Sequence, residues 1–485
     1  MTNPAAEIAY REDVELRLRA DRSTARPVLF VFALAIFWLL VGSVFGVIAS
    51  IKLHLPDWLV RQQWLTFGIV RTAHLDVMAY GWASLAMIGV ALWTFPRLLH
   101  VELLWPRVAM VGAVSWNIGL VVGVALLLQG RNNGMEWLEL DRYYSVPFLV
   151  LGGACVAASL IRTLIARRAP HLYVSVWYIV GAFIWFPIIY VAGNWPTLKG
   201  VESASTNWFY AHNALGLWFA PICLAAIYYF MPKVLGRPIH SYQLSLLGFW
   251  TLAFFYALNG MHHLIGGPIP TWMITTSIVA SVLMVIPVVA VAVNHHMTMI
   301  GRFGALRYSP TLRFIVVGAI AYTAVSLQGS FTALREVNRI THFTHWTVAH
   351  AHVGAYAFVT LALFGAIYYI MPRITRREWP SAALIKWHFW LVLIGISIYV
   401  IALTIAGLFQ GLALLDPGTP FQVSVERTIW ALWSRSFAGV MLTAGHIVFA
   451  INFFLMTRGP EPAWRIPPLH EVQPVIYRGD DEVAP

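Results

Sequence analysis

His350 and His352 stand two residues apart inside an apolar run that reaches from about Phe343 to Met371. Such a run is long enough to cross a bilayer as a helix, which takes roughly 20 residues. Helical residues follow one another at about 100°, so the two imidazoles leave the helix about 200° apart and cannot share one metal. Ionisable residues inside a membrane are costly and usually functional. The pair therefore predicts one ligand for each of two cofactors. The alternative is two buried, hydrogen-bonded histidines.

Four further histidines are predicted at the same depth: His74 on the second span, His212 on the sixth, and His262 and His263 on the seventh. Since successive spans alternate in direction, all six histidines are expected in the outer, non-cytoplasmic half of the membrane. Imidazole is a ligand for haem iron and for copper, and a low-spin haem needs two axial histidines. Six histidines divide as two, one and three, which describes a low-spin haem, a high-spin haem and a three-histidine metal. The adjacent pair can reach one ion if the chain is irregular there, as Gly260 allows.

The composition is that of a polytopic membrane protein. The 485 residues are 59% hydrophobic and 11% charged, and the mean hydropathy is +0.70. These values fit no soluble class. The net charge of +11 lies in loops, so it does not indicate a nucleic-acid partner. The apolar runs predict an all-α protein of about twelve transmembrane helices, at 28–51, 66–95, 107–129, 146–167, 171–194, 207–231, 244–267, 270–300, 311–333, 343–371, 386–410 and 430–457.

The stretches between these spans are short, so we expect one catalytic membrane domain at 28–458. A cytoplasmic N-terminal segment at 1–27 precedes it, and a cytoplasmic tail at 459–485 follows. Basic residues concentrate in every second loop, which by the positive-inside rule places both termini in the cytoplasm. Cys155 and Cys223 lie in apolar runs, and no C-x-x-C-H occurs. There is therefore no disulfide framework and no covalent c-type haem, and any haem is held non-covalently.

Taken together, these motifs resemble subunit I of the haem-copper oxidase superfamily. More narrowly, they resemble its C family, the cytochrome cbb-type oxygen reductases. The resemblance extends from about Leu65 to Asn452. It rests on the span-two histidine, His212-Asn213, His262-His263, the H-x-H of span ten, Tyr256 six residues before His262, Gly236-Arg237-Pro238-Ile239-His240-Ser241-Tyr242 and Lys386-Trp387-His388-Phe389-Trp390.

The resemblance implies that His74 and His352 ligate a low-spin haem b and that His350 is the proximal ligand of a high-spin haem b. It assigns copper to His212, His262 and His263. It also implies that Tyr256 is the active-site tyrosine, cross-linked to His212. A phenol there can lend one electron and one proton to O–O cleavage. The alternative for Tyr256 is an ordinary interfacial aromatic residue.

The resemblance extends to four supporting side chains. Arg71 and Arg435 can pair with haem propionates as guanidinium groups do with carboxylates, or they can simply cap their helices. Glu136 and Glu139 match an acidic pair that in this family lies near a calcium and propionate site. The alternative for the two acids is a solvated rim.

Protons must come from the cytoplasm, and the family has a single lower pathway. Its residues are matched by Tyr229, Ser241, Tyr242 and Ser245, for which the alternative is ordinary polar residues at loop ends. Two positions depart from the family pattern. Gln328 stands where a glutamate is usual, which puts the outer proton exit in doubt. Asp76 stands where an asparagine is usual, either facing the surface or tuning the low-spin haem.

The predicted function is a terminal oxidase in the bacterial inner membrane that reduces O2 to water and conserves energy as a proton gradient. Its electrons are expected from membrane-anchored c-type cytochrome subunits. The nearest alternative is nitric oxide reductase, whose metal site takes a glutamate four residues after the span-six histidine. Here that position is Gly216. A transporter or haem carrier is the second alternative. It predicts repeats and paired midplane charges, which the sequence lacks.

Overall fold

The computed structural model describes residues 4–458, so the predicted C-terminal tail lies outside the described residues. Between residues 4 and 458 the chain is helical and contains no strand, and twelve helical segments are long and apolar enough to span a membrane. The prediction of twelve spans in an all-α protein is confirmed. The spans are formed by α1 (Pro4–Lys52); α2 (Phe67–Asp76), η2 (Val77–Ala83) and α3 (Ser84–Leu99); α4 (Pro106–Leu128); α5 (Val146–Ile165); α6 (Val174–Gly193); α7 (Gly200–Ala214), η3 (Leu215–Phe219) and α8 (Ala220–Leu235); α9 (Tyr242–Tyr256) and η4 (Met261–Leu264); α10 (Thr271–Leu283) and α11 (Val285–Met299); α12 (Pro310–Thr332); α14 (His345–His352), η6 (Val353–Thr360) and α15 (Leu361–Thr375); α16 (Ala382–Leu415); and α17 (Phe421–Arg458).

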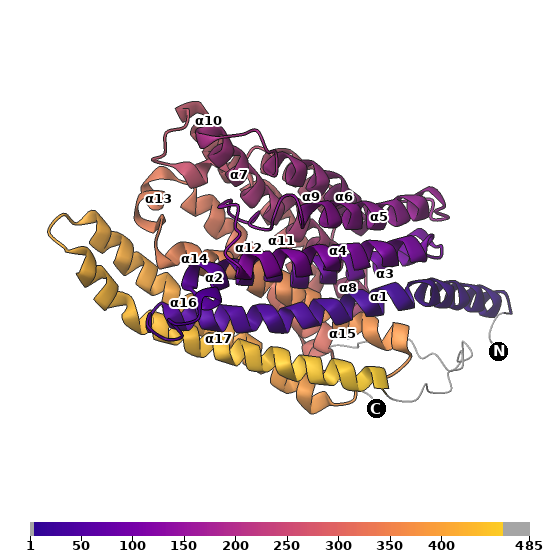
Figure 1. The fold of residues 1–485 in the computed structure, drawn as a ribbon. Coiled ribbons are helices and arrows are strands. Elements are labelled where there is room, and N and C mark those ends of the chain that lie inside the picture. Colours follow the sequence, from indigo (N-terminus) through magenta and orange to yellow (C-terminus); the bar gives the residue numbers. More distant parts are fainter. Residues whose placement is uncertain (1–3, 459–485) are drawn as a thin grey trace.

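The helices run side by side as one elongated bundle (Figure 1). The start of α1 and the end of α17 lie at the same end of this bundle, as an even number of crossings requires. The short helix α13 (Arg335–Thr341) and the connection between α16 and α17 lie towards the opposite end. The bundle is therefore a multi-pass membrane architecture.

The first helix begins earlier than the predicted start at residue 28, because α1 is continuous from Pro4. An ion pair explains part of this extension. Asp21 Oδ1 lies 2.6 Å from Arg97 Nη1, both side chains are about nine-tenths buried, and the guanidinium lies over the ring of Trp93. Removing one partner of a buried ion pair typically costs about 3–5 kcal/mol. The polar segment before residue 28 is therefore in part a structural extension of the first span.

Three spans contain a π-helical stretch, and each stretch follows directly on a helix that ends with a predicted histidine ligand in its last turn. The stretch η2 follows His74, η3 follows His212, and η6 follows His350 and His352. π-Helical turns are rare and occur frequently at functional sites. They fall in spans two, six and ten, a recurrence every fourth span that the sequence does not reveal as a repeat.

Buried indoles tie these stretches together in the core. Trp82 of η2 donates its N–H to Thr360 of η6, whose hydroxyl donates to the carbonyl of Ala355. In the same way Trp218 of η3 donates to Ser84, whose hydroxyl donates to Ala79. Each hydroxyl satisfies a carbonyl of a widened turn, and such satisfaction is needed where no water is present. Span two is therefore hydrogen-bonded to both of the other spans that contain a π-helical stretch.

Candidate metal centre

His212, His262 and His263 converge on one point. Their ligand nitrogens all lie within 4.8 Å of one another, and within residues 4–458 no other group of three or more His, Cys, Asp or Glu has this spacing. The ring centroid of His212 lies 4.8 Å from that of His262 and 5.3 Å from that of His263. Three imidazoles at this spacing can hold one transition-metal ion.

Local irregularity brings the two adjacent histidines to the same side, as predicted. Helix α9 ends at Tyr256, Gly260 has φ +122°, and the short 3₁₀ turn η4 carries both rings. A Cβ at Gly260 would lie 2.7 Å from the carbonyl oxygen of Trp208, so the close approach also requires glycine. Each of the two rings also contacts a residue that is not part of the histidine cluster. His262 Nδ1 lies 2.8 Å from Ser277 Oγ, and His263 stacks on Trp208 with centroids 4.5 Å apart.

Tyr256 lies against His212. Their ring centroids are 4.8 Å apart at an interplanar angle of 29°. His212 Nδ1 is buried and has no hydrogen-bond partner among the described residues, whereas Ser277 holds Nδ1 of His262. An unpaired buried nitrogen is costly unless a further group satisfies it. This donor set therefore fits a bound metal better than it fits an empty histidine cluster.

His350 faces this cluster and His352 faces away, which confirms the prediction that the two rings leave α14 on different sides. His350 lies within electrostatic range of His212, His262 and His263. Its Nδ1 donates to Gln328 Oε1 on α12 at 3.0 Å. The carboxamide at position 328 therefore orients the ring and leaves Nε2 free as a ligand, the usual arrangement around a metal-binding histidine.

His74 and His352 form the second group. His74 Nδ1 donates to the carbonyl of Gly42 on α1 at 2.7 Å, and His352 Nδ1 donates to Val348 within α14 at 2.9 Å. His74 lies within electrostatic range of His352. In both rings Nδ1 is bound to a backbone carbonyl. Nε2 has no hydrogen bond to any residue in the part of the chain that the structure describes, so both rings can serve as axial ligands. Five of the six histidines keep accessible surface, and His262 alone of the six is buried.

The two predicted arginines differ in their surroundings. Arg435 lies within electrostatic range of His74 and His352, and its guanidinium is 5.7 Å from the ring centroid of Tyr399. Its Nε is buried without a hydrogen-bond partner among the described residues, so this N–H can still donate a hydrogen bond to an anion. Arg71 instead forms an ion pair with Glu136 at 2.6 Å and lies 4.0 Å from Glu139.

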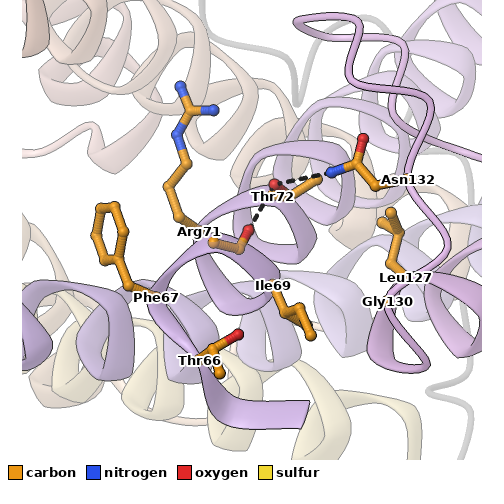
Figure 2. Close-up of a pocket in the computed structure, with 9 residues that line it drawn as sticks. Thr66, Phe67, Ile69, Arg71, Thr72, Leu127, Gly130 and Asn132 are labelled. Atoms are coloured by element: carbon orange, nitrogen blue, oxygen red, sulfur yellow. Dashed lines mark hydrogen bonds between the residues drawn. The ribbon is translucent and has the colours of Figure 1, made fainter. Parts of the chain in front are cut away.

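The acidic pair is partly buried rather than a solvated rim. Glu139 is 3% exposed, and burial together with the charge of Glu136 raises the pKa of Glu139 to about 7. A pocket of about 430 Å³ opens beside Arg71 at the outer end of α2 (Figure 2). Its wall includes a hydrogen bond from Asn132 to the hydroxyl of Thr72. The pocket contains none of the six histidines, so it is separate from the metal centre.

Asp76 does not face the surface. Its side chain is 0% exposed and lies beside Glu139. Surface exposure, one of the two alternatives for this residue, is therefore wrong. The carboxyl group stands two residues after His74 and belongs to its immediate surroundings.

The four predicted proton-path residues do not form one hydrogen-bonded chain. The hydroxyl of Tyr229 accepts from Arg97 at 3.2 Å, and Tyr242 donates to Leu172. Ser241 caps α9, and Ser245 donates to the carbonyl of Tyr242. Ser245 is buried, while Tyr242 is 39% exposed. These hydroxyls line the same end of the bundle, but each is bound locally.

A neighbouring set of buried polar residues reaches further into the bundle. Asn294 on α11 donates to the hydroxyl of Tyr228 at 3.4 Å and also donates to the carbonyl of Ser241. Tyr322 on α12 lies near both Tyr228 and Tyr256, without a hydrogen bond to either. Asn294 and Tyr322 could have been found from the sequence, since they are polar side chains within apolar spans. Which of the adjacent residues Tyr228 and Tyr229 faces Asn294 cannot be decided without the fold.

Fold and site together define a multi-pass membrane protein with a three-histidine centre. The model of the family described as "Cytochrome C and Quinol oxidase polypeptide I" matches residues 26–441. The chain is 29% identical over 448 residues to a cytochrome c oxidase subunit 1 homolog from Azorhizobium caulinodans, covering 88% of this chain and 81% of that protein. It is 29% identical over 447 residues to a Cbb3-type cytochrome c oxidase subunit CcoN1 from Stutzerimonas stutzeri, covering 89% and 94%. A nitric oxide reductase subunit from the same organism is 24% identical over 470 residues, covering 91% and 96%.

A solved haem-copper terminal oxidase dimer shares the fold. The TM-score is 0.72 at 15% identity, covering 90% of this chain and 85% of that one. Because the family model spans most of its length, the chain belongs to the cytochrome c and quinol oxidase polypeptide I family, subunit I of the haem-copper oxidases. The family implies haem and copper as cofactors and a place in a multi-subunit complex. The free Nε2 atoms of His74, His350 and His352 and the unpaired Nδ1 of His212 fit such cofactors.

Proposed function

We propose that this chain is the catalytic subunit of a cbb-type terminal oxidase, which reduces O2 to water with electrons from c-type cytochromes and couples the reaction to proton uptake and pumping. The observation that carries the proposal is the three-histidine cluster with Tyr256 stacked on His212 and His350 facing it.

The proposed cofactors are two b haems and one copper ion. His74 and His352 hold the low-spin haem, His350 holds the high-spin haem, and His212, His262 and His263 hold copper. When bound, the high-spin haem and the copper would provide the O2 site, and the low-spin haem would pass them the electrons that arrive from c-type cytochromes. Arg435 would pair with haem propionates through its buried Nε. Arg71 would do the same with the part of its guanidinium that Glu136 leaves open.

Tyr256 is proposed to hold the reacting proton at its hydroxyl and to lend it, with one electron, to O–O cleavage. Contact between its ring and His212 supports the proposed cross-link. Protons reach it from the cytoplasmic end past Ser241, Tyr242, Ser245 and Tyr229. The set Asn294, Tyr228 and Tyr322 supports this direction, since it leads from Ser241 towards Tyr256.

Nitric oxide reduction is the alternative within the same superfamily. A glutamate at position 216 would serve its metal, but a Cβ placed on Gly216 would overlap the ring of Tyr256. Tyr256 and a carboxylate at position 216 therefore exclude each other in this fold. This packing, together with the lower identity to nitric oxide reductase, favours the oxidase.

Metal analysis combined with paired turnover measurements tests the proposal on the purified complex. We expect copper, haem b in low-spin and high-spin forms, and oxygen uptake well above nitric oxide consumption. Non-haem iron in place of copper, or low-spin spectra alone with no oxygen uptake, would contradict the proposal.

A calcium ion is proposed at Glu136 and Glu139. Support comes from Glu139 Oε2, which is buried without a hydrogen-bond partner between residues 4 and 458, and from the raised pKa of Glu139. A bound divalent cation would displace the proton of this carboxyl group and stabilise the carboxylate. Replacing Glu139 with glutamine is expected to lower the calcium content of the purified complex, measured by elemental analysis. Glu102→Gln, at an exposed loop position, is the matched control. Equal calcium in both variants would argue against the site.

Electron entry is proposed through membrane-anchored c-type cytochrome subunits, since Cys155 and Cys223 are free cysteines and provide no haem c attachment. The proposed location is the bacterial inner membrane. The distribution of basic loops supports cytoplasmic termini, with 1–27 and 459–485 on that side of the membrane domain.

A further inference from the structure

A buried histidine outside the predicted ligand set links two helices of the bundle. His446 on α17 is 2% exposed, and both of its ring nitrogens are engaged. Nδ1 lies 2.7 Å from Ser43 Oγ on α1, and Nε2 lies 2.7 Å from the hydroxyl of Tyr356 in η6. A histidine with two partners from two other elements is a bridge rather than a space filler.

The direction of each hydrogen bond in this bridge follows from the single proton of a hydroxyl. Ser43 Oγ donates its proton to the carbonyl of Leu39 at 2.6 Å. It must therefore accept from His446 Nδ1–H. In a neutral imidazole the other nitrogen is then an acceptor, so Tyr356 donates its O–H to Nε2. The chain Tyr356, His446, Ser43, Leu39 is fully satisfied with one defined polarity.

Each end of the bridge is attached to one proposed low-spin haem ligand. The N–H of Ser43 and the carbonyl of Gly42 belong to one planar peptide unit, and that carbonyl accepts from His74 Nδ1. Tyr356 lies four residues after His352, in the π-helical stretch that continues its helix. His446 thus connects the backbone that orients one ligand with the segment that carries the other.

We infer that His446 is a positioning residue for the low-spin haem, setting the orientation of His74 and His352 relative to each other. The inference rests on the proposed ligand roles of these two histidines. Partners beyond the direct ligands fix ring orientation and ligand basicity, and axial ligation and hydrogen bonding set the spectrum and potential of a haem. The bridge therefore joins the two segments that carry the proposed ligands of the low-spin haem.

His388 on α16 provides a matched control. It is also a fully buried histidine, with Nδ1 2.9 Å from the hydroxyl of Tyr368. Phe364 contacts both His388 and His446, so the two histidines share an aromatic environment. The other ring nitrogen of His388 has no partner within residues 4–458, so this histidine bridges neither to the peptide unit that holds His74 nor to η6. A purely structural role predicts the same effect for both histidines.

The test is His446→Leu in the complete purified complex, read by the electron paramagnetic resonance g-values of the ferric low-spin haem and by its midpoint potential. We expect both to shift, with the high-spin haem signal unchanged, while His388→Leu leaves the low-spin haem as in the wild type. His446→Gln, whose amide can donate and accept, is expected to restore part of the shift. Unchanged g-values and potential in His446→Leu, or equal shifts in both leucine variants, would overturn the inference.

Should His446→Leu fail to accumulate, Tyr356→Phe and Ser43→Ala each remove one hydroxyl from the bridge with little change in volume. A smaller shift in both supports the inference, and no shift in either overturns it. His74→Ala separates this from the proposed function. Survival of the low-spin signal in that variant would reject the ligand assignment itself, whatever His446 does.

Discussion

Replacing His350 with alanine is expected to remove the high-spin haem from the purified complex while the low-spin haem remains. His350 is oriented by Gln328 and offers only Nε2 to a ligand. His352 leaves α14 on the other side, beside Tyr399 with ring centroids 4.4 Å apart. Losing even a supporting partner of a metal ligand costs about 10–100-fold in activity, so oxygen uptake should fall by more than about 100-fold. Optical spectra of the reduced complex report both haems.

The control is His345→Ala, which removes an imidazole from the same helix but from outside the proposed ligand set. Both haem signals should persist there. Loss of the low-spin signal in His350→Ala, with the high-spin signal retained, would reverse the assignment of His350 and His352.

Replacing Tyr256 with phenylalanine is expected to stop turnover without emptying the site. The ring that contacts His212 is retained and only the hydroxyl is lost, so copper and both haems should remain at wild-type content. Proton transfer by a positioned side chain contributes about 10²–10⁴-fold. A loss of oxygen uptake in that range is therefore expected, measured together with metal content.

Tyr190→Phe is a suitable comparison, because Tyr190 is also buried, at 4% exposure, but lies among Tyr80, Tyr210 and Phe186. Its oxygen uptake should match the wild type. Full activity in Tyr256→Phe would leave Tyr256 as a packing residue and remove the main chemical argument for the oxidase.

The spans and the histidine set are predictable from sequence, because both depend on local and additive properties. A membrane span needs only a long apolar run, and the alternation of spans determines which histidines share a depth. The convergence of His212, His262 and His263 follows once the irregularity at Gly260 is allowed. Long-range contacts are not predictable in this way. The ion pair of Asp21 with Arg97 joins residues 76 positions apart, and nothing local indicates that the first helix extends to Pro4.

Single-residue choices on one helix also lie beyond the sequence. Tyr228 and Tyr229 are neighbours, yet about 100° of rotation points one to Asn294 and the other to Arg97. In the same way, Gln328 reads as a missing acid in the sequence, whereas the fold makes it the acceptor for His350. Asp76 could be exposed or buried until the loop that carries Glu139 is placed beside it.

The π-helical stretches limit which insertions and deletions the sequence of this bundle can tolerate. Each one alters the helical phase between the part of a span that carries the histidines and the part that packs in the core. A one-residue deletion within Val353–Thr360 would turn His350 and His352 by about 100° relative to α15, although neither histidine had been replaced. Chain length between ligand and core is therefore as constrained as residue identity. An ordinary transmembrane helix can accommodate an insertion or deletion at its ends. Within these π-helical stretches the same change would rotate the histidines relative to the core.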